Sequence, residues 1–314
     1  MEEVYLGIDT SCYTTSVAVL NAEGQLLGEA RKILDVKPGR CGLQQSEMVF
    51  QHTRNLPNLV EQVLQGKEYN LKGIGVSGYP RPLEGSYMPA FLAGLSVARS
   101  LAALTGAKLN IISHQENHLE AGVWSAQGPC AKRFLLLHAS GGTTDLLLAE
   151  QQEDGRYKLT EVGGSMDLHA GQFIDRVGVA LGLQFPTGPA LEKLAATATE
   201  MVELPISVRK LQVSLSGPAT AALRKLEAGA DGPALALGVE YALAETFVRM
   251  LRNGGAAYEV EDVLLVGGVA SNSYIRQHVT ERLAKRRMRT WVPEARFSCD
   301  NASGCAAFAW RMRG

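Results

Sequence analysis

Three kinds of feature are scarce in this sequence of 314 residues: paired cysteines, long apolar runs and an excess of charge. The five cysteines, at positions 12, 41, 130, 299 and 305, form no CxxC pair, which argues against a disulfide framework or a thiolate zinc site. No apolar run approaches about 18 residues, so no membrane span is expected. No basic stretch followed by an apolar run opens the sequence, and we therefore expect no signal peptide and a cytoplasmic protein.

Charge of the two signs is nearly balanced, with 31 Lys and Arg against 32 Asp and Glu. This balance excludes a globally basic nucleic-acid-binding protein but leaves room for a local basic patch. Such a patch occurs in LAKRRMR, where Lys285, Arg286, Arg287 and Arg289 are grouped. A solvated helix end is the ordinary interpretation of this run, and a contact with nucleic-acid phosphates is the alternative.

A unit of three predicted strands occurs twice in the sequence. VYLGIDTS, TTSVAVLN and LLGEARKIL are separated by turns in the first 35 residues, and FLLLHAS, TTDLLLAE and YKLTEVGG follow residue 133. A period of about 130 residues is too long for a solenoid and indicates two related lobes. A shift of 129 positions pairs Ser11 with Ser140, Thr14 with Thr143, Thr15 with Thr144 and Val17 with Leu146.

Helical and strand-like segments alternate after each of these units, which indicates mixed sheets with helices on both faces. This pattern predicts two duplicated ribonuclease-H-like lobes of the α/β superfold of actin, Hsp70 and sugar kinases, with a nucleotide cleft between them. We expect one lobe at 1–112 with about 295–314, and the other at 113–294. Two independent α/β domains with ordinary hairpins are the alternative. Helices are expected at 44–65, 90–104, 171–182, 188–199, 233–254 and 272–287, and strands at 73–80, 109–114 and 262–270.

The turn of the first unit has more hydroxyl groups than a chain reversal needs. In IDTSCYTTSVAVL, Asp9, Ser11 and Thr14 stand between two apolar strands. Serine and threonine hydroxyls can hydrogen-bond the oxygens of a ligand, and Asp9 can face a metal or its bound water. These three residues are our candidate catalytic group, and a simple reversal of the chain is the alternative.

The turn of the second unit, ASGGTTDL, is the stronger candidate for binding an anion. Gly141 and Gly142 allow successive backbone N–H groups to converge on a phosphate, and Ser140 and Thr143 add hydroxyl donors. A plain Gly-Gly hairpin is the alternative interpretation.

Two further segments favour a ligand close to the backbone. In LLVGGVASNSYIR, Gly267 and Gly268 lie at a strand-to-helix corner, where a helix N-terminus favours anions and Asn272 can contact a base or ribose. A plain N-cap explains Asn272 but not the two glycines. In AGQFIDRVGVALGLQFPTGPALEKLA, Asp175 is a candidate for a ribose contact and Gly188 for close backbone approach. A helical hairpin with a Pro-Gly turn is the alternative there.

The segment SHQENHLEAG predicts a helix that carries two metal ligands. Ser113 and Glu116 have the spacing of a capping box, so a helix should begin there. His114 and His118 then lie on one helical face, four residues apart, with rings able to meet one ion. Such a pair needs further ligands, and Asp300 is a candidate, with a helix N-cap as its alternative role.

Together these segments resemble the tRNA threonylcarbamoyladenosine transferase family, also called O-sialoglycoprotein endopeptidases or peptidase family M22. The resemblance covers nearly the whole chain. The segments that carry it, in chain order, are LGIDTSCYTTSVAVL, SEMVFQH, HQENHLEAG, SGGTT, FIDRVGVALGLQFPTGPALEKLA, VSLSG, GGVASN and CDNAS.

The resemblance implies a division of roles between the two lobes. His114, His118 and Asp300 would hold a divalent metal, iron or zinc, on the side of the first lobe, which is the metal and acceptor side. The family transfers threonylcarbamoyl from threonylcarbamoyl-AMP to N6 of adenosine in tRNA, with AMP as leaving group. Threonylcarbamoyl-AMP, AMP or ATP would therefore be the ligand of the second lobe. Its binding residues would be His138, Ala139, Ser140, Gly141, Gly142, Asp175, Gly188, Gly267, Gly268 and Asn272.

The chain departs from the family pattern at several polar positions. Tyr13 and Thr14 stand where the family has two acids, and Gln172 replaces a glutamate. Thr143 replaces a histidine after the Gly-Gly pair, and Gln115 replaces the second histidine of a His-His pair. Lost acids would change how an attacking amine is positioned or deprotonated. These departures indicate a divergent paralogue.

We therefore expect a metal-dependent carbamoyl-type transferase, with tRNA or an altered acceptor. The alternative is a non-catalytic, nucleotide-binding partner or scaffold of a tRNA-modification complex. A sugar or acetate kinase would leave the histidine pair without a role, and a glycoprotease would need a glutamate beside it to activate water. The expected partners are the adenylate, tRNA through the basic cluster of LAKRRMR, and other proteins of such a complex.

Overall fold

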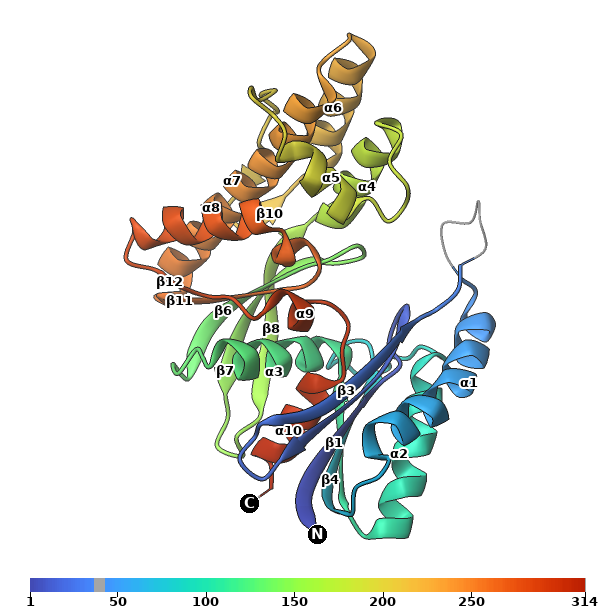
Figure 1. Cartoon of the computed structure of the whole chain (residues 1–314). Coiled ribbons are helices and arrows are strands. Elements are labelled where there is room, and N and C mark those ends of the chain that lie inside the picture. The colour runs from blue at the N-terminus through green and yellow to red at the C-terminus, as the bar shows by residue number, and fades with distance from the viewer. Residues whose placement is uncertain (37–42, 314) are drawn as a thin grey trace. The chain divides into compact units, whose positions relative to one another are not determined.

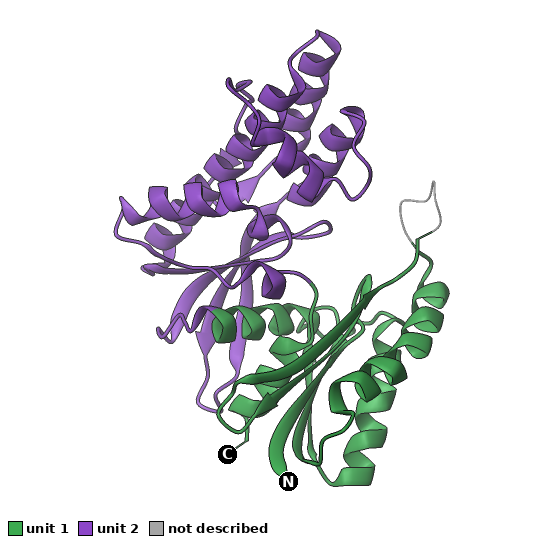
Figure 2. Ribbon diagram, in the orientation of Figure 1, with its two compact units in different colours: residues 1–125, 300–314 green, residues 126–299 purple. Residues whose placement is uncertain are grey.

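The computed structural model describes residues 1–36 and 43–313 and divides the chain into two compact units. The first comprises Met1–Ser125 with Asp300–Gly314, and the second Ala126–Cys299 (Figure 2). The first unit thus includes residues 113–125, which were expected in the other lobe, and the second includes residues 295–299, which were expected in the first. Cys41 lies outside the described residues. Among the described helices, none combines the length and apolarity needed to cross a membrane.

The first unit is built on a five-stranded mixed sheet in the order β3-β2-β1-β4-β5 (Figure 1). Three antiparallel strands come first, and β4 and β5 extend the sheet in parallel with β1. The strands are β1 (Glu2–Asp9), β2 (Thr14–Asn21), β3 (Leu26–Ile33), β4 (Tyr69–Tyr79) and β5 (Lys108–Ser113).

Helices cover both faces of this sheet, as the alternation of its buried side chains requires. On β2, Val17 and Val19 belong to the core formed with α1 (Gln45–Leu64) and α2 (Phe91–Thr105). The intervening Ala18 and Leu20 pack instead with α10 (Ser303–Arg311) on the other face. Figure 1 shows α1 and α2 on one side of these strands and α10 on the other.

Glycine in two neighbouring strands lets α10 lie directly on the sheet. A Cβ atom at Gly7 of β1 would overlap the carbonyl of Ala302, and one at Gly75 of β4 would overlap the carbonyl of Cys305. The close contact fixes the C-terminal helix, and the residues that precede it, against β1 and β4.

The second unit contains a seven-stranded sheet in the order β12-β11-β6-β7-β8-β10-β9. Its central strands repeat the arrangement of the first unit, with an antiparallel β6-β7-β8 and with β11 and β12 added in parallel. The strands are β6 (Arg133–Ala139), β7 (Thr144–Gln151), β8 (Tyr157–Ser165), β9 (Val208–Arg209), β10 (Gln212–Val213), β11 (Asp262–Val266) and β12 (Arg289–Trp291).

The pairing register confirms the internal duplication. Asp9 pairs with Ser16 in the first unit, and His138 pairs with Asp145 in the second, so both partners differ by 129 positions. The same displacement relates the far ends of the two hairpins, Val4 with Asn21 and Arg133 with Glu150. Five strands of each unit therefore share order and direction, and the first hairpins share their register, which is the duplicated α/β architecture that the sequence predicted.

A long buried helix organises the remaining core. α7 (Gly232–Tyr258) has 27 residues and contributes Leu235, Val239, Leu243 and Phe247 to a cluster with side chains of β6 and β11. α6, α9 and the short strands β9, β10 and β12 were not predicted from the sequence. The other helices of this unit are α4 (Ala170–Ala180), α5 (Gly188–Ala195), α6 (Ser216–Glu227), the 3₁₀ turn η1 (Val269–Ser271), α8 (Ser273–Ala284) and α9 (Ala295–Ser298).

Candidate metal centre and nucleotide-binding rim

The expected histidine pair lies on the first turns of α3 (His114–Ala126). A capping box starts this helix: the Glu116 backbone N–H donates to Ser113 Oγ at 3.1 Å, and the Ser113 N–H donates to the Glu116 carboxylate at 2.7 Å. One helical turn then brings the Nε2 atoms of His114 and His118 to 3.2 Å from each other. The Nε2 atoms of the two rings therefore point toward the same position.

Asp300 completes this cluster, and it does so from the opposite end of the chain. Its Oδ1 lies 3.6 Å from His114 Nε2 and 3.4 Å from His118 Nε2. Asp300 is not the N-cap of α10, because Ala302 occupies that position, and the N–H of Ser303 at the start of the helix donates to Asn301 Oδ1 at 2.9 Å. The Asn301 carbonyl also accepts a 2.7 Å hydrogen bond from the Asn117 amide of α3, which holds the Asp300 segment against the histidines.

These separations suit two or three ligands of one ion. Two atoms bonded about 2.0–2.1 Å from a tetrahedral ion lie about 3.3 Å apart, close to the distances among the two Nε2 atoms and Asp300 Oδ1. Burial lowers the pKa of both His114 and His118, which favours the neutral imidazoles that coordinate metals. The donor set of two imidazoles and a carboxylate fits iron or zinc.

Cys12 is a further donor that sequence reasoning missed. Its Sγ lies 3.8 Å from His114 Nε2, and the donor atoms of Cys12, His114 and Asp300 all lie within 4.8 Å of one another. Without a metal, burial and the charges of Asp300 and Asp9 raise the pKa of this thiol well above its usual value. No spacing rule could have found it, because Cys12 and His114 are 102 positions apart.

Asp9 lies at the end of β1 and anchors the first turn. Its fully buried carboxylate accepts hydrogen bonds from the Ser11 backbone N–H at 3.2 Å, from the Ser11 hydroxyl at 2.9 Å and from the Ser77 hydroxyl of β4. Burial, followed by the charge of Asp300, raises the pKa of Asp9 to about 7, although these hydroxyls act in the other direction. Oδ2 is 4.0 Å from His114 Nδ1, so Asp9 stands behind a predicted metal ligand.

His52 of α1 fixes the other side of this turn. Its Nε2 is 3.0 Å from the Cys12 carbonyl, and its Nδ1 is 2.8 Å from the Thr15 hydroxyl. Thr14, the third predicted catalytic residue, is the half-buried first residue of β2, and its side chain forms no hydrogen bond among the described residues. Tyr13, one of the departures from the family pattern, is 41% exposed.

In the second unit, the glycine turn between β6 and β7 is open. The Ser140 N–H donates to the Thr143 carbonyl at 2.8 Å and closes the hairpin, while Gly141 and Gly142 are exposed, with nothing within 4 Å of a Cβ at either position. The turn rests on the start of α4, because the Gly171 N–H donates to the Ser140 carbonyl at 3.0 Å. Of the predicted binding residues before the turn, His138 and Ala139 are buried in β6.

The strand-to-helix corner after β11 also needs its glycine. Gly267 has φ +98°, and a Cβ there would overlap the Ala139 carbonyl of β6. Asn272 caps α8 by accepting the Ile275 N–H at 2.9 Å, and its amide donates to the carboxylate of Glu240 on α7. The capping role of Asn272 is therefore observed, with both ends of its amide already hydrogen-bonded.

The predicted ribose residue Asp175 braces the entry to α5. Its Oδ1 accepts the Thr187 N–H at 2.8 Å and the Thr187 hydroxyl at 3.1 Å. Gly188 follows as the first residue of α5 and has open space where a Cβ would point. Gln172, which replaces the family's glutamate, accepts the His169 N–H at 3.1 Å in the cap of α4.

These contacts connect the predicted nucleotide residues into a continuous rim. The turn at Ser140 contacts α4, α4 holds the start of α5 through Asp175, and the corner at Gly267 returns to β6 at Ala139. Glu192 of α5 closes the rim, because its carboxylate accepts the N–H of Ser273 at 2.8 Å. Glu192 and Glu240 were missed in the sequence, since a lone glutamate on a helix has no signal of its own.

One of the four residues of the basic cluster forms an ion pair within the described part of the protein. Arg289 in β12 forms a 2.6 Å ion pair with Asp262. Lys285, Arg286 and Arg287 are exposed at the end of α8 and form no ion pair with any residue that the structure describes. A role for them in binding nucleic acid stays a prediction.

Comparison with known proteins finds relatives along nearly the whole chain. The model of the TsaD family, tRNA N6-adenosine threonylcarbamoyltransferase, matches residues 43–307. A tRNA N6-adenosine threonylcarbamoyltransferase of Thermus thermophilus is 31% identical over 313 residues, covering 98% of this chain and 92% of the relative. A probable bifunctional tRNA threonylcarbamoyladenosine biosynthesis protein of Methanothermobacter thermautotrophicus is 30% identical over 97% of this chain, which spans only 54% of that longer protein.

Solved structures support the fold independently of close sequence similarity. A glucokinase of the ROK family from Streptomyces griseus, in complex with glucose and AMPPNP, has a TM-score of 0.56 at 10% identity, and the similarity covers 98% of this chain and 99% of the glucokinase. The fold is therefore that of the actin, Hsp70 and sugar-kinase superfold. Together with the family match, these findings show that the chain belongs to the tRNA N6-adenosine threonylcarbamoyltransferase family.

Proposed function

We propose that the protein transfers a threonylcarbamoyl group from threonylcarbamoyl-AMP to N6 of an adenosine in tRNA. The observation that carries this proposal is the match to transferases along almost the whole chain, together with the convergence of His114, His118 and Asp300. Some relatives are about twice as long as this chain, so any activity of their additional part is outside the proposal.

The reaction is an acyl-type transfer in which one bond replaces another. The N6–C bond forms, the bond between the carbamoyl carbon and the phosphate oxygen breaks, and AMP leaves with the electron pair while N6 loses a proton. A bound iron or zinc ion would polarise the carbamoyl group and offset negative charge. In this proposal His114, His118 and Asp300 hold the ion, and Cys12 is available as an additional ligand.

The residues of the first turn would orient the reacting groups. Asp9 accepts a hydrogen bond from Ser11, which fixes the turn, and its carboxylate lies 4.0 Å from His114 Nδ1, on the side of the imidazole away from the proposed ion. Because Tyr13 and Thr14 replace two acids of the family, Asp9 is the carboxylate that this turn retains. Ser11 and Thr14 are proposed to contact the carbamoyl end of the ligand.

The rim of the second unit is proposed to hold the adenylate. The exposed N–H groups of Gly141 and Gly142 suit the phosphate, and the open position at Gly188 allows close approach of the ribose. Asp175 and Asn272 would act chiefly by shaping the rim, since Thr187 and Glu240 already bind their side chains. His138, Ala139, Ser140, Gly267 and Gly268 complete the proposed set.

The proposed function also implies a location and partners for the protein. The cytoplasm is the proposed location, and other proteins of a tRNA-modification complex are proposed partners. The exposed cations of the cluster Lys285, Arg286, Arg287 and Arg289 are proposed to contact tRNA phosphates.

The proposal is tested by incubating the metal-loaded protein with threonylcarbamoyl-AMP and unmodified tRNA. We expect AMP release and threonylcarbamoyladenosine in the nuclease digest, measured by liquid chromatography and mass spectrometry. His118→Ala should lose both products, whereas His278→Ala, a histidine substitution on α8, should retain them. Failure of the wild-type protein to form the modified nucleoside, also with the proteins of its complex added, would refute the proposal.

A further inference from the structure

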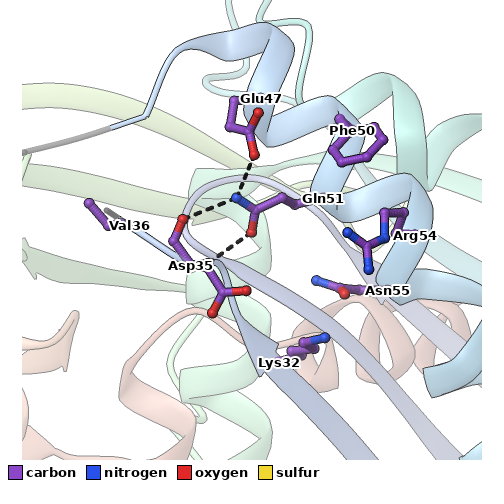
Figure 3. Close-up of a pocket in the computed structure, with 8 residues that line it drawn as sticks. All are labelled: Lys32, Asp35, Val36, Glu47, Phe50, Gln51, Arg54 and Asn55. Atoms are coloured by element: carbon purple, nitrogen blue, oxygen red, sulfur yellow. Dashed lines mark hydrogen bonds between the residues drawn. The ribbon is translucent and has the colours of Figure 1, made fainter. Parts of the chain in front are cut away.

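A pocket of about 370 Å³ lies between the end of β3 and the first half of α1 (Figure 3). It belongs to the first unit and is separate from the metal cluster. Its wall combines an aromatic ring, two cations, two carboxylates and two amides. The lining residues are Lys32, Asp35, Val36, Glu47, Phe50, Gln51, Arg54 and Asn55.

The cations of this pocket are not neutralised by the described part of the chain. Neither Lys32 nor Arg54 forms an ion pair with a described residue, and both are exposed. The Arg54 guanidinium lies 5.5 Å from the centre of the Phe50 ring, and that ring is 55% exposed. An arginine beside an exposed aromatic ring offers a charge for a phosphate and a flat surface for a base.

The acidic side of the pocket is held in place by Gln51. Its amide nitrogen donates to the Asp35 carbonyl at 3.0 Å and to the Glu47 carboxylate at 2.9 Å, and its oxygen accepts the Asp35 N–H at 2.8 Å (Figure 3). The carboxylate of Asp35 takes no part in these bonds. It is therefore available as an acceptor for a hydroxyl of the ligand.

Building on the proposed function, we propose that this pocket binds one nucleotide of the RNA acceptor in single-stranded form. The base would stack on Phe50, the phosphate would contact Arg54 and Lys32, and the ribose 2′-hydroxyl would donate to Asp35. One ribonucleotide carries all three of these groups. Recognition through stacking on an aromatic ring and through the 2′-hydroxyl is how proteins read unpaired RNA.

The pocket is also connected with the turn that carries Cys12. The Asn55 amide in its wall donates a hydrogen bond to the Thr15 hydroxyl at 3.4 Å. His52 is hydrogen-bonded both to the Thr15 hydroxyl and to the Cys12 carbonyl. A nucleotide held here would therefore be anchored on the same rigid part of the first unit as the proposed metal ligands.

The test measures binding of a fluorescent hairpin RNA with unpaired loop nucleotides, and of the DNA hairpin of the same sequence, by anisotropy over a range of salt concentrations. Phe50→Ala should weaken RNA binding about tenfold, as expected for one lost stack, with an unchanged salt dependence. Arg54→Ala should weaken binding and lower the slope of log K against log salt by about 0.7. Asp35→Asn should reduce the preference for RNA over DNA.

Arg99→Ala is the matched control, because Arg99 is an exposed cation on α2 that does not line the pocket. It should bind RNA like the wild type, and unfolding midpoints should be equal for all variants. Wild-type affinity in both Phe50→Ala and Arg54→Ala would overturn the inference, as would an equal loss in Arg99→Ala. If these variants lose RNA binding while the wild type transfers no threonylcarbamoyl group, the pocket stands and the proposed function fails. If transfer occurs with an unchanged KM for tRNA in both variants, the pocket fails alone.

Discussion

Glu240 makes the stability of the second unit depend on pH near neutrality. This side chain on α7 is 2% exposed, and its carboxylate accepts the amide of Asn272. Burial raises the pKa of Glu240 from 4.5 to about 7; the hydrogen bond from Asn272 opposes this shift, and the charge of Glu192 adds to it. The acid is therefore protonated in the folded protein at pH values where the unfolded chain has lost the proton.

The sign and size of the effect follow from this difference. Between pH 4.5 and pH 7 the folded state binds more protons than the unfolded state, so the free energy of unfolding falls as pH rises. A difference of about 2.5 pKa units corresponds to a loss of about 3 kcal/mol across this range. For a unit of this size, that loss lowers the unfolding midpoint by about 6–12 °C.

Glu240→Gln tests this reasoning, because glutamine is neutral at every pH and can still accept the hydrogen bond of Asn272. We expect the variant to lose less stability than the wild type between pH 5 and pH 8, measured by calorimetry of the unfolding transition. Glu227→Gln, an exposed substitution on α6, should keep the pH dependence of the wild type. Parallel profiles for Glu240→Gln and the wild type would refute the assigned role of Glu240.

Three other substitutions test separate parts of the account. Gly75→Ala should destabilise the first unit by about 3 kcal/mol in denaturant unfolding, because the new Cβ would meet the backbone of α10. Gly217→Ala, with open space around it, should be neutral or stabilising. Equal effects of the two substitutions would contradict the packing of α10 on the sheet. His114→Ala should abolish bound metal, measured by mass spectrometry of the elements, while His278→Ala retains it. Burial acts to raise the pKa of Asp167, but hydrogen bonds from serine hydroxyls and backbone N–H groups outweigh it and hold this pKa well below its usual range. Asp167→Asn should therefore lose less unfolding free energy than the wild type between pH 5 and pH 2, and an equal loss would contradict this.

The architecture was accessible from the sequence because local patterns repeat along the chain. Alternation and turn residues located the three-strand units, and the shift of 129 positions matched hydroxyl-rich turns that the strand register later aligned. The metal cluster was also accessible, since a capping box fixed the start of α3 and the helical period fixed the faces of His114 and His118.

Residues that act across long sequence separations could not be found in this way. Cys12 meets His114 only because β1 ends beside the start of α3, and His52 reaches the same turn from α1. Glu240 meets Asn272 through the packing of α7 against α8. Such contacts depend on tertiary packing, which leaves no periodic or spacing signal in a single sequence.

The most direct test of the central claim is the stoichiometry of a single reaction with threonylcarbamoyl-AMP and tRNA. The account predicts one AMP released for each threonylcarbamoyladenosine formed, and loss of both products in His118→Ala. AMP release without the modified nucleoside, or full activity of His118→Ala, would contradict the claim that this chain transfers the threonylcarbamoyl group at the cluster of His114, His118 and Asp300.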